Sequence, residues 1–121
     1  MRCLIVDDSR TFLTAARSLL EMEGIAVVAA CTTAAEALMR VTEAPVDVAV
    51  VDVMLGSDSS VELAQQLRAV GCRVVMTSTH ERADIEDLLS ESLAVGFLPK
   101  TELCAETLRR TIDRPPPAAG G

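Results

Sequence analysis

The sequence predicts an α/β fold in which five strands form one parallel sheet with helices on both faces. Short apolar runs alternate five times with segments of helical periodicity along the chain. The apolar runs are nearly free of polar residues, which is typical of parallel strands covered on both faces. The length of 121 residues suits a single domain. Right-handed crossovers between such strands give a doubly wound sheet.

Each predicted strand is a short run rich in Val, Ile, Leu, Ala or Met, bounded by turn residues. We place the strands at residues 3–6, 26–30, 46–51, 73–76 and 96–98. The helices are expected between them and after the last strand.

The first helix is predicted from apolar residues at helical spacing, with Gly24 in position to end it in a left-handed conformation. Thr33-x-x-Glu36 and Ser59-x-x-Glu62 are capping boxes that start the second and third helices. The last helix is expected to begin near residue 101. The predicted apolar stripes are Phe12, Ala15, Ala16, Leu19 and Leu20; Ala37, Leu38 and Val41; Leu63, Ala64, Leu67 and Val70; Ile85, Leu88, Leu89 and Leu93; and Cys104, Leu108 and Ile112.

The C-terminal residues 114–121 are rich in Pro and Gly and cannot continue the last helix. We therefore expect a domain at residues 1–113 and a tail or linker at 114–121. The tail is either a free end or a connection to a second domain.

Composition limits the classes of partner. The net charge of −7 disfavours direct contact with DNA, RNA or anionic membranes. With Phe12 and Phe97 as the only aromatic residues, base stacking is not expected. No apolar run approaches the length needed to span a bilayer. The cysteines are scattered without a C-x-x-C pair, which favours core-filling thiols in a reducing cytoplasm. They are Cys3, Cys31, Cys72 and Cys104.

Polar side chains follow the predicted strands where the strands end. Asp7 and Asp8 follow the first strand, Asp52 the third, the hydroxyl run 77–79 the fourth, and Lys100 the fifth. Because sites in such sheets form at the carboxyl ends of strands, we expect these groups to converge. Three carboxylates would repel one another, and an oxygen-rich acidic cluster favours a hard cation such as Mg²⁺.

The ordered set Asp7-Asp8, Asp52, Ser78 and Lys100 resembles the receiver domain of two-component response regulators, the CheY-like family. Residues 61–63 and 96–100 also resemble the family, and the resemblance covers about residues 1–113. It implies a flavodoxin-like (βα)5 sheet in the strand order 2-1-3-4-5.

The resemblance implies a phosphorylation site. Asp52 would accept a phosphoryl group, and Mg²⁺ would be held by Asp7, Asp8, Asp52 and the backbone carbonyl of Met54. Phosphoryl transfer depends mainly on positioning and charge stabilisation, which a metal and a lysine around a carboxylate can supply.

The resemblance assigns the remaining polar groups to the phosphoryl group and to the response. Ser78, Thr79 and Lys100 would bind the phosphoryl oxygens. Ser78 and Phe97 would form the switch, with Phe97 reporting a change in the face made by strand 4, helix 4 and strand 5. Apolar Met54 cannot orient a water molecule, so we expect a long-lived phosphoaspartate.

The family also implies the partners. A histidine kinase or a phosphotransfer protein would donate the phosphoryl group, and an output domain or downstream protein would receive the signal. A homodimer through the helix 4–strand 5–helix 5 face is one assembly that the resemblance allows. Such a domain catalyses only its own phosphorylation and dephosphorylation, so we do not expect an enzyme with another substrate.

Four residues differ from the usual family pattern. Gly56 stands where Pro is usual, Ser60 and Leu93 where Gly is usual, and Thr101 where Pro usually follows the lysine. The loop after Asp52 is therefore expected to follow a different path.

Other interpretations remain open at this level. The same fold could serve as a pseudo-receiver, an interaction module that works without phosphorylation. Individually, the acidic residues could cap helices or turns, Ser78 could be a turn residue, Lys100 could be solvated, and Phe97 could simply fill the core. A phosphatase with an aspartate nucleophile would usually need a second aspartate where Met54 stands.

Overall fold

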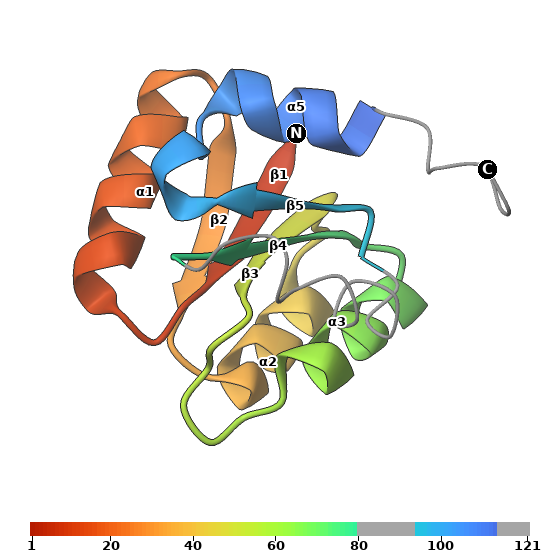
Figure 1. Ribbon diagram of the computed structural model, residues 1–121. Coiled ribbons are helices and arrows are strands. Elements are labelled where there is room, and N and C mark those ends of the chain that lie inside the picture. The colour runs from red at the N-terminus through yellow and green to blue at the C-terminus, as the bar shows by residue number, and fades with distance from the viewer. Residues whose placement is uncertain (80–93, 114–121) are drawn as a thin grey trace, which may run out of the picture.

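Five parallel strands form one sheet in the order β2-β1-β3-β4-β5 (Figure 1). The computed structural model describes residues 1–79 and 94–113. The predicted strand order is thus confirmed, and the helix predicted at residues 85–93 and the tail at 114–121 lie outside the described residues. The elements are β1 (Arg2–Val6), α1 (Arg10–Met22), β2 (Ala26–Cys31), α2 (Ala34–Glu43), β3 (Val48–Asp52), α3 (Ser60–Ala69), β4 (Arg73–Ser78), β5 (Gly96–Pro99), the 3₁₀ turn η2 (Lys100–Glu102) and α5 (Ala105–Asp113).

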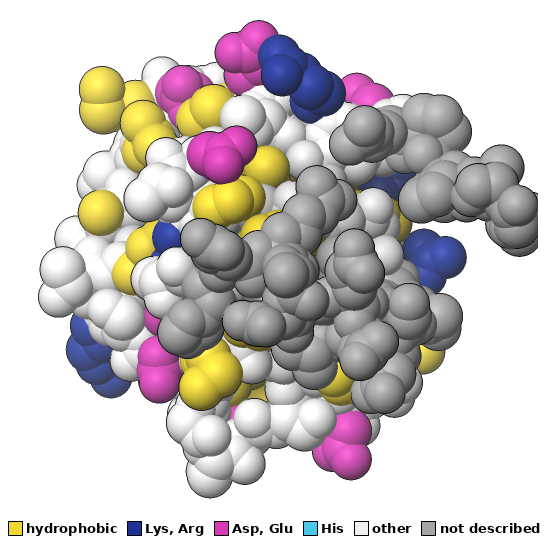
Figure 2. Space-filling model, in the orientation of Figure 1, with side chains coloured by type: hydrophobic (Ala, Val, Ile, Leu, Met, Phe, Trp, Pro, Cys, Tyr) yellow, Lys and Arg dark blue, Asp and Glu magenta, His cyan; other side chains and the backbone are white. Residues whose placement is uncertain are grey.

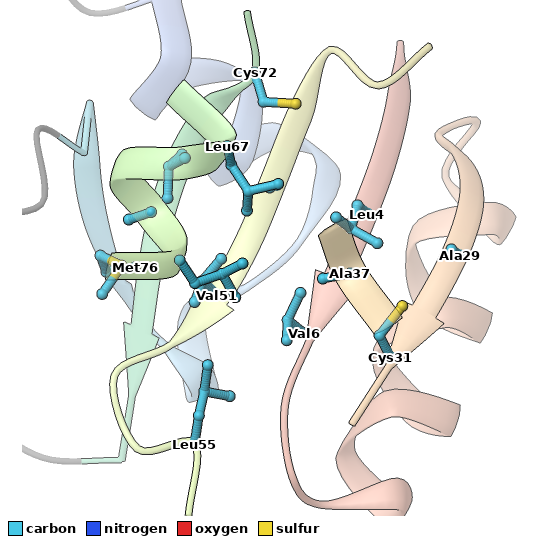
Figure 3. Packing of buried hydrophobic residues seen from close by; sticks show 14 of the residues in the cluster. Leu4, Val6, Ala29, Cys31, Ala37, Val51, Leu55, Leu67, Cys72 and Met76 are labelled. Atoms are coloured by element: carbon cyan, nitrogen blue, oxygen red, sulfur yellow. The ribbon is translucent and has the colours of Figure 1, made fainter. Parts of the chain in front are cut away.

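The helices cover both faces of the sheet, α1 and α5 on one side and α2 and α3 on the other (Figure 1). Along each strand the buried side chains alternate between the two faces, as a pleated strand requires. Leu4, Val6 and Val51 point toward α2 and α3 (Figure 3). Ile5 and Val50 belong to the cluster on the side of α1 and α5. The two clusters share no residue, so the sheet separates two cores.

The strand boundaries differ from the prediction at the carboxyl edge of the sheet. β4 continues to Ser78 and β5 to Pro99, because backbone pairing with the neighbouring strand extends past the apolar run. β3 includes Asp52, which pairs with Thr77 of β4. The polar residues at this edge are therefore held in the sheet itself.

Helix starts follow the predicted caps. The side chains of Thr33 and Ser59 accept hydrogen bonds from the backbone N–H groups three residues on, and Ser9 does the same for α1. Gly24 and Gly71 have φ of +92° and +96°, so they end α1 and α3 in the left-handed conformation that glycine favours.

Two helix predictions were wrong in detail. The buried stripe of α1 is Leu13, Ala16 and Leu20, whereas Ala15 and Leu19 are exposed, because the buried face of the helix is narrower than the predicted stripe and lies nearer to Leu13. Val70 is likewise exposed, at the C-terminal cap of α3.

The last helix begins at Ala105 rather than near residue 101. Residues 100–102 form a 3₁₀ turn, and Cys104 and Thr107 then exchange hydrogen bonds that start the helix. The Ala105 N–H also donates to Glu23 Oε1 at 2.9 Å, which joins the end of α1 to the start of α5. This contact spans 82 residues of sequence, so no local pattern predicts it.

The visible surface mixes charges. On the face in Figure 2, the Lys and Arg side chains of the described residues lie apart and are interspersed with Asp and Glu. The described residues visible on that face therefore form no continuous basic patch of the kind that binds nucleic acid. No helix among the described residues is both long enough and apolar enough to cross a membrane.

Candidate phosphorylation and metal site

Asp7, Asp8 and Asp52 come together at the carboxyl edge of the sheet. One carboxylate oxygen from each lies within 4.8 Å of the other two. Asp7 is fully buried, Asp52 is 4% exposed, and Asp8 faces solvent. The predicted convergence of the three acidic residues is thus present, and it includes one carboxylate that an ion can approach from outside.

Lys100 reaches into this cluster from the turn after β5. Its Nζ lies 2.6 Å from Asp7 Oδ2 and 3.2 Å from Asp52 Oδ2. The same ammonium stands 4.5 Å above the centre of the Phe12 ring, where the negative face of the ring attracts it. Lys100 is therefore not a solvated lysine, and its side chain is only 15% exposed.

Backbone N–H groups fix the other oxygens of the two buried carboxylates. Asp7 Oδ1 accepts from Ser9 N at 2.8 Å, and Asp52 Oδ1 accepts from Met54 N at 3.1 Å. Each buried aspartate thus has one oxygen held by the backbone and one directed to Lys100. Neither serves simply as the cap of a neighbouring helix.

The site shifts two pKa values. Burial raises the pKa of Asp52 above its usual value, and the negative charge of Asp7 raises it further. The hydrogen bond from the Met54 N–H and the contact with Lys100 lower this pKa but do not cancel the rise. Burial alone would lower the pKa of Lys100, but its hydrogen bonds to Asp7 and Asp52 outweigh that and raise it. The lysine therefore stays charged, while the charge on Asp52 is only partly compensated.

The donor set fits Mg²⁺. Three carboxylates face one ammonium, so negative charge remains in excess. Asp7 Oδ2 is buried and makes no hydrogen bond of regular geometry, although the Lys100 ammonium is its ion-pair partner. Hard oxygen donors with excess negative charge are what Mg²⁺ binds. Asp7, Asp8 and Asp52 would hold the ion. The resemblance to the family implies the backbone carbonyl of Met54 as a further ligand.

The remaining predicted residues occupy the same edge. Ser78 is buried at the end of β4 and Thr79 is exposed just beyond it. Phe97 is 7% exposed and packs in the cluster on the side of α2 and α3, so it does fill the core, and its switch role stays a prediction. Met54 is 59% exposed.

The loop after β3 contains backbone geometry that depends on glycine. Gly56 has φ of +62°, which proline cannot adopt, and a Cβ there would lie 4.0 Å from Asp8 Oδ2. The Ser60 hydroxyl donates to Val53 O at 3.0 Å, and Asp58 Oδ2 accepts from Ala34 N at 2.9 Å. The first bond closes the loop between its two ends, and the second ties the loop to the start of α2.

Sequence reasoning missed several of these residues. The sequence pattern places Phe12 only in the helix stripe, although its place in the first turn of α1 puts it near the end of β1. No sequence pattern marks Asp58 and Ser60, because the path of the loop determines which groups they can hydrogen-bond. Thr77 was grouped with the neighbouring hydroxyls but given no role.

Comparisons with known proteins identify the family of the chain. The family model for the response regulator receiver domain matches residues 3–113. No curated protein is significantly similar to the chain in sequence.

Solved structures share the fold over 93% of the chain. The receiver domain of a modulated diguanylate cyclase from Desulfovibrio desulfuricans G20 has 28% identity, a TM-score of 0.79 and 90% of its own chain covered. The receiver domain of the response regulator NarL from Mycobacterium tuberculosis has 25% identity, a TM-score of 0.76 and 97% covered. A CheY-like receiver domain protein from Methanospirillum hungatei JF-1 has 24% identity, a TM-score of 0.75 and 90% covered. With a family match over nearly its whole length, this chain belongs to the response regulator receiver domain family.

Proposed function

We propose that the protein is a phosphorylatable signalling switch whose phosphoacceptor is Asp52. The observation that carries this is the buried carboxylate of Asp52 beside Asp7, with the Lys100 ammonium between them at 3.2 Å and 2.6 Å. The site thus brings together a nucleophile, Asp52, and a cation for the transferred group, Lys100. Asp7 and Asp8 stand beside them as carboxylates that fit Mg²⁺. This arrangement meets the needs of phosphoryl transfer.

The donor in this proposal is a phosphohistidine of a histidine kinase or a phosphotransfer protein. An Asp52 carboxylate oxygen forms the new O–P bond as the P–N bond breaks. The electron pair of that bond stays on the imidazole nitrogen, which takes a proton from solvent. Mg²⁺, when bound, would neutralise charge on the phosphoryl oxygens. Lys100 pairs with the same oxygens, and Ser78 and Thr79 stand at the strand end to donate hydroxyl hydrogens.

The response follows from the new charge. A phosphorylated side chain carries about −1.5 to −2 charge near neutral pH, more than the carboxylate it replaces. That charge draws Lys100 away from Asp7 and toward the phosphoryl group. Ser78 and Phe97 lie on neighbouring strands, so a shift at Ser78 can be passed to Phe97 and then to a bound output domain or partner protein.

One experiment tests the proposal directly. The full chain is incubated with an acyl phosphate and Mg²⁺, and the intact mass is measured. We expect one phosphoryl adduct on the wild type, none on Asp52→Asn, and a normal adduct on Asp47→Asn, an exposed aspartate near the opposite end of β3. An adduct that survives in Asp52→Asn would refute the site.

The pseudo-receiver is the second candidate, and one observation favours it. Lys100 pairs with both buried carboxylates, so each of these charges has a partner within the chain that needs no phosphoryl chemistry. A wild-type protein that forms no adduct and shows no change in melting temperature with Mg²⁺ would support this alternative.

A further inference from the structure

Thr77 has a buried hydroxyl that the site has not yet explained. The residue is 1% exposed, and its Oγ1 has no hydrogen-bond partner in the structure of residues 1–79 and 94–113. Within that part of the chain, the other buried side-chain oxygen without a hydrogen bond is Asp7 Oδ2, which belongs to the acidic cluster. A buried donor without a partner destabilises the folded state, so its presence calls for an explanation.

The sheet places Thr77 beside the phosphoacceptor. Thr77 is the register partner of Asp52 on the neighbouring strand, and neighbouring strands lie about 4.8 Å apart. Alternation along β3 and β4 sets the direction of the two side chains. Val50 and Val75 belong to the cluster on the side of α1 and α5, and Asp52 and Thr77, two residues further along, share that face.

The same alternation puts Thr77 in one row with the charged residues. On β1, Ile5 belongs to the same cluster, so Asp7 projects to that face as well. Lys100 follows Leu98 of the same cluster by two residues, and its ammonium contacts Asp7 and Asp52. Ser78 is offset by one residue from Thr77, so its side chain projects to the other face of the sheet, where Met76 packs on the side of α2 and α3. Thr77 and Ser78 therefore approach the site from different sides.

We propose, on the basis of the phosphorylation proposed above, that Thr77 is a positioning residue whose hydroxyl donates a hydrogen bond to the Asp52 side chain in the phosphorylated state. In the unphosphorylated protein, Lys100 pairs with Asp52 Oδ2. When Lys100 turns to the phosphoryl oxygens, that carboxyl oxygen loses its ammonium partner. The adjacent Thr77 hydroxyl replaces it and holds the acyl group in place, while Ser78 serves the phosphoryl oxygens.

If Thr77 has this role, removing its hydroxyl should raise the melting temperature and lower the rate of phosphorylation. Thr77→Val keeps the branched shape and removes the unpartnered hydroxyl, so the metal-free protein should melt at a higher temperature. The same variant should form the adduct about fivefold more slowly at saturating acyl phosphate, the effect of one ordinary hydrogen bond. Mg²⁺ affinity should not change, since Thr77 offers no ligand to the ion.

Matched variants separate the hydroxyl from packing. Thr77→Ser keeps the hydroxyl and should phosphorylate close to the wild-type rate. Thr42→Val removes an exposed hydroxyl on α2 and should leave rate and adduct unchanged. A Thr77→Val protein with the wild-type rate, a Thr77→Ser protein as slow as Thr77→Val, or a lower melting temperature for Thr77→Val would each overturn the inference. A wild type that forms no adduct would instead overturn the proposed function, and the role of Thr77 with it.

Discussion

Lys100 Nζ lies closer to Asp7, at 2.6 Å, than to Asp52, at 3.2 Å. In the metal-free protein the lysine is thus the counter-ion of Asp7, a carboxylate that fits a metal ion, and of Asp52, the proposed phosphoacceptor. The ammonium and a bound Mg²⁺ would therefore compete for Asp7, which has two consequences for the proposed Mg²⁺ binding and phosphorylation.

Replacing Lys100 should separate metal binding from phosphoryl transfer. Lys100→Gln removes a positive charge next to the carboxylates, so Mg²⁺ should bind more tightly, by about fivefold or more. Adduct formation should nevertheless become slower, because the cation for the phosphoryl group is lost. Titration of Mg²⁺ by calorimetry and the intact-mass assay measure the two effects. Weaker Mg²⁺ binding in Lys100→Gln would contradict the competition.

Replacing Asp52 should stabilise the metal-free protein. Because the folded state raises the pKa of Asp52 above its usual 3.8, the folded state binds more protons than the unfolded state just above that pH. The contribution of Asp52 to stability therefore falls as pH rises through this window, and its charge is destabilising at pH 7. Asp52→Asn should melt at a higher temperature than the wild type at pH 7, with the difference vanishing as pH falls toward 3.8.

The control for this prediction is Glu62→Gln, an exposed carboxylate in the first turn of α3. Its melting temperature should not rise at pH 7. Thermal unfolding in the presence of a chelator measures both variants. An Asp52→Asn protein that melts below the wild type at pH 7 would mean that Lys100 stabilises the charged form more than burial opposes it.

Gly96 should not tolerate a side chain. A Cβ at this position would lie 2.5 Å from Thr111 Cγ2, because α5 packs directly on β5. Gly96→Ala should lower the free energy of unfolding by about 1–3 kcal/mol, the usual cost of overpacking. Thr111→Ala removes the opposing methyl group, so the double variant should recover about 1 kcal/mol or more in a double-mutant cycle. Additive losses in denaturant unfolding would contradict this contact.

Met54 should make the phosphoaspartate long-lived. Its exposed, apolar side chain follows Asp52 by two residues and offers no group to orient an attacking water. The adduct on the wild type should therefore last for minutes rather than seconds after the donor is removed. Met54→Asn should shorten this lifetime severalfold, measured by intact mass against time. A wild-type half-life of seconds would contradict the prediction.

The fold and the convergence of the acidic residues could be predicted because they depend on alternation and on which end of a parallel strand a residue follows. Asp7, Asp8, Asp52 and Lys100 meet for that reason alone. The buried stripe of α1 could not be predicted exactly. Leu13 and Leu20 are next to Phe12 and Leu19 in the sequence, and only the position of the helix on the sheet determines which of these apolar residues are buried.

The finer contacts of the site depend on distances that no pattern encodes. Thr77 and Ser78 were expected just past the end of β4, because the prediction ended the strand with its apolar residues, whereas backbone pairing continues through both. The preference of Lys100 for Asp7 and its position above Phe12 follow from the path of the 3₁₀ turn. The bond from Ala34 to Asp58 joins residues 24 apart through a loop with a glycine at positive φ.

That loop has a thermodynamic consequence. The Asp58 side chain bonds the loop to the first turn of α2, and the bond from the Ser60 hydroxyl to Val53 O closes the loop at its base. Leu55, within the loop, is buried in the core. Its backbone entropy is therefore lost when the chain folds and not when a cation arrives. A cation bound at the proposed site beside Met54 would meet a loop that these contacts already hold in place, so its binding free energy would go into the ion–oxygen contacts and not into ordering the chain.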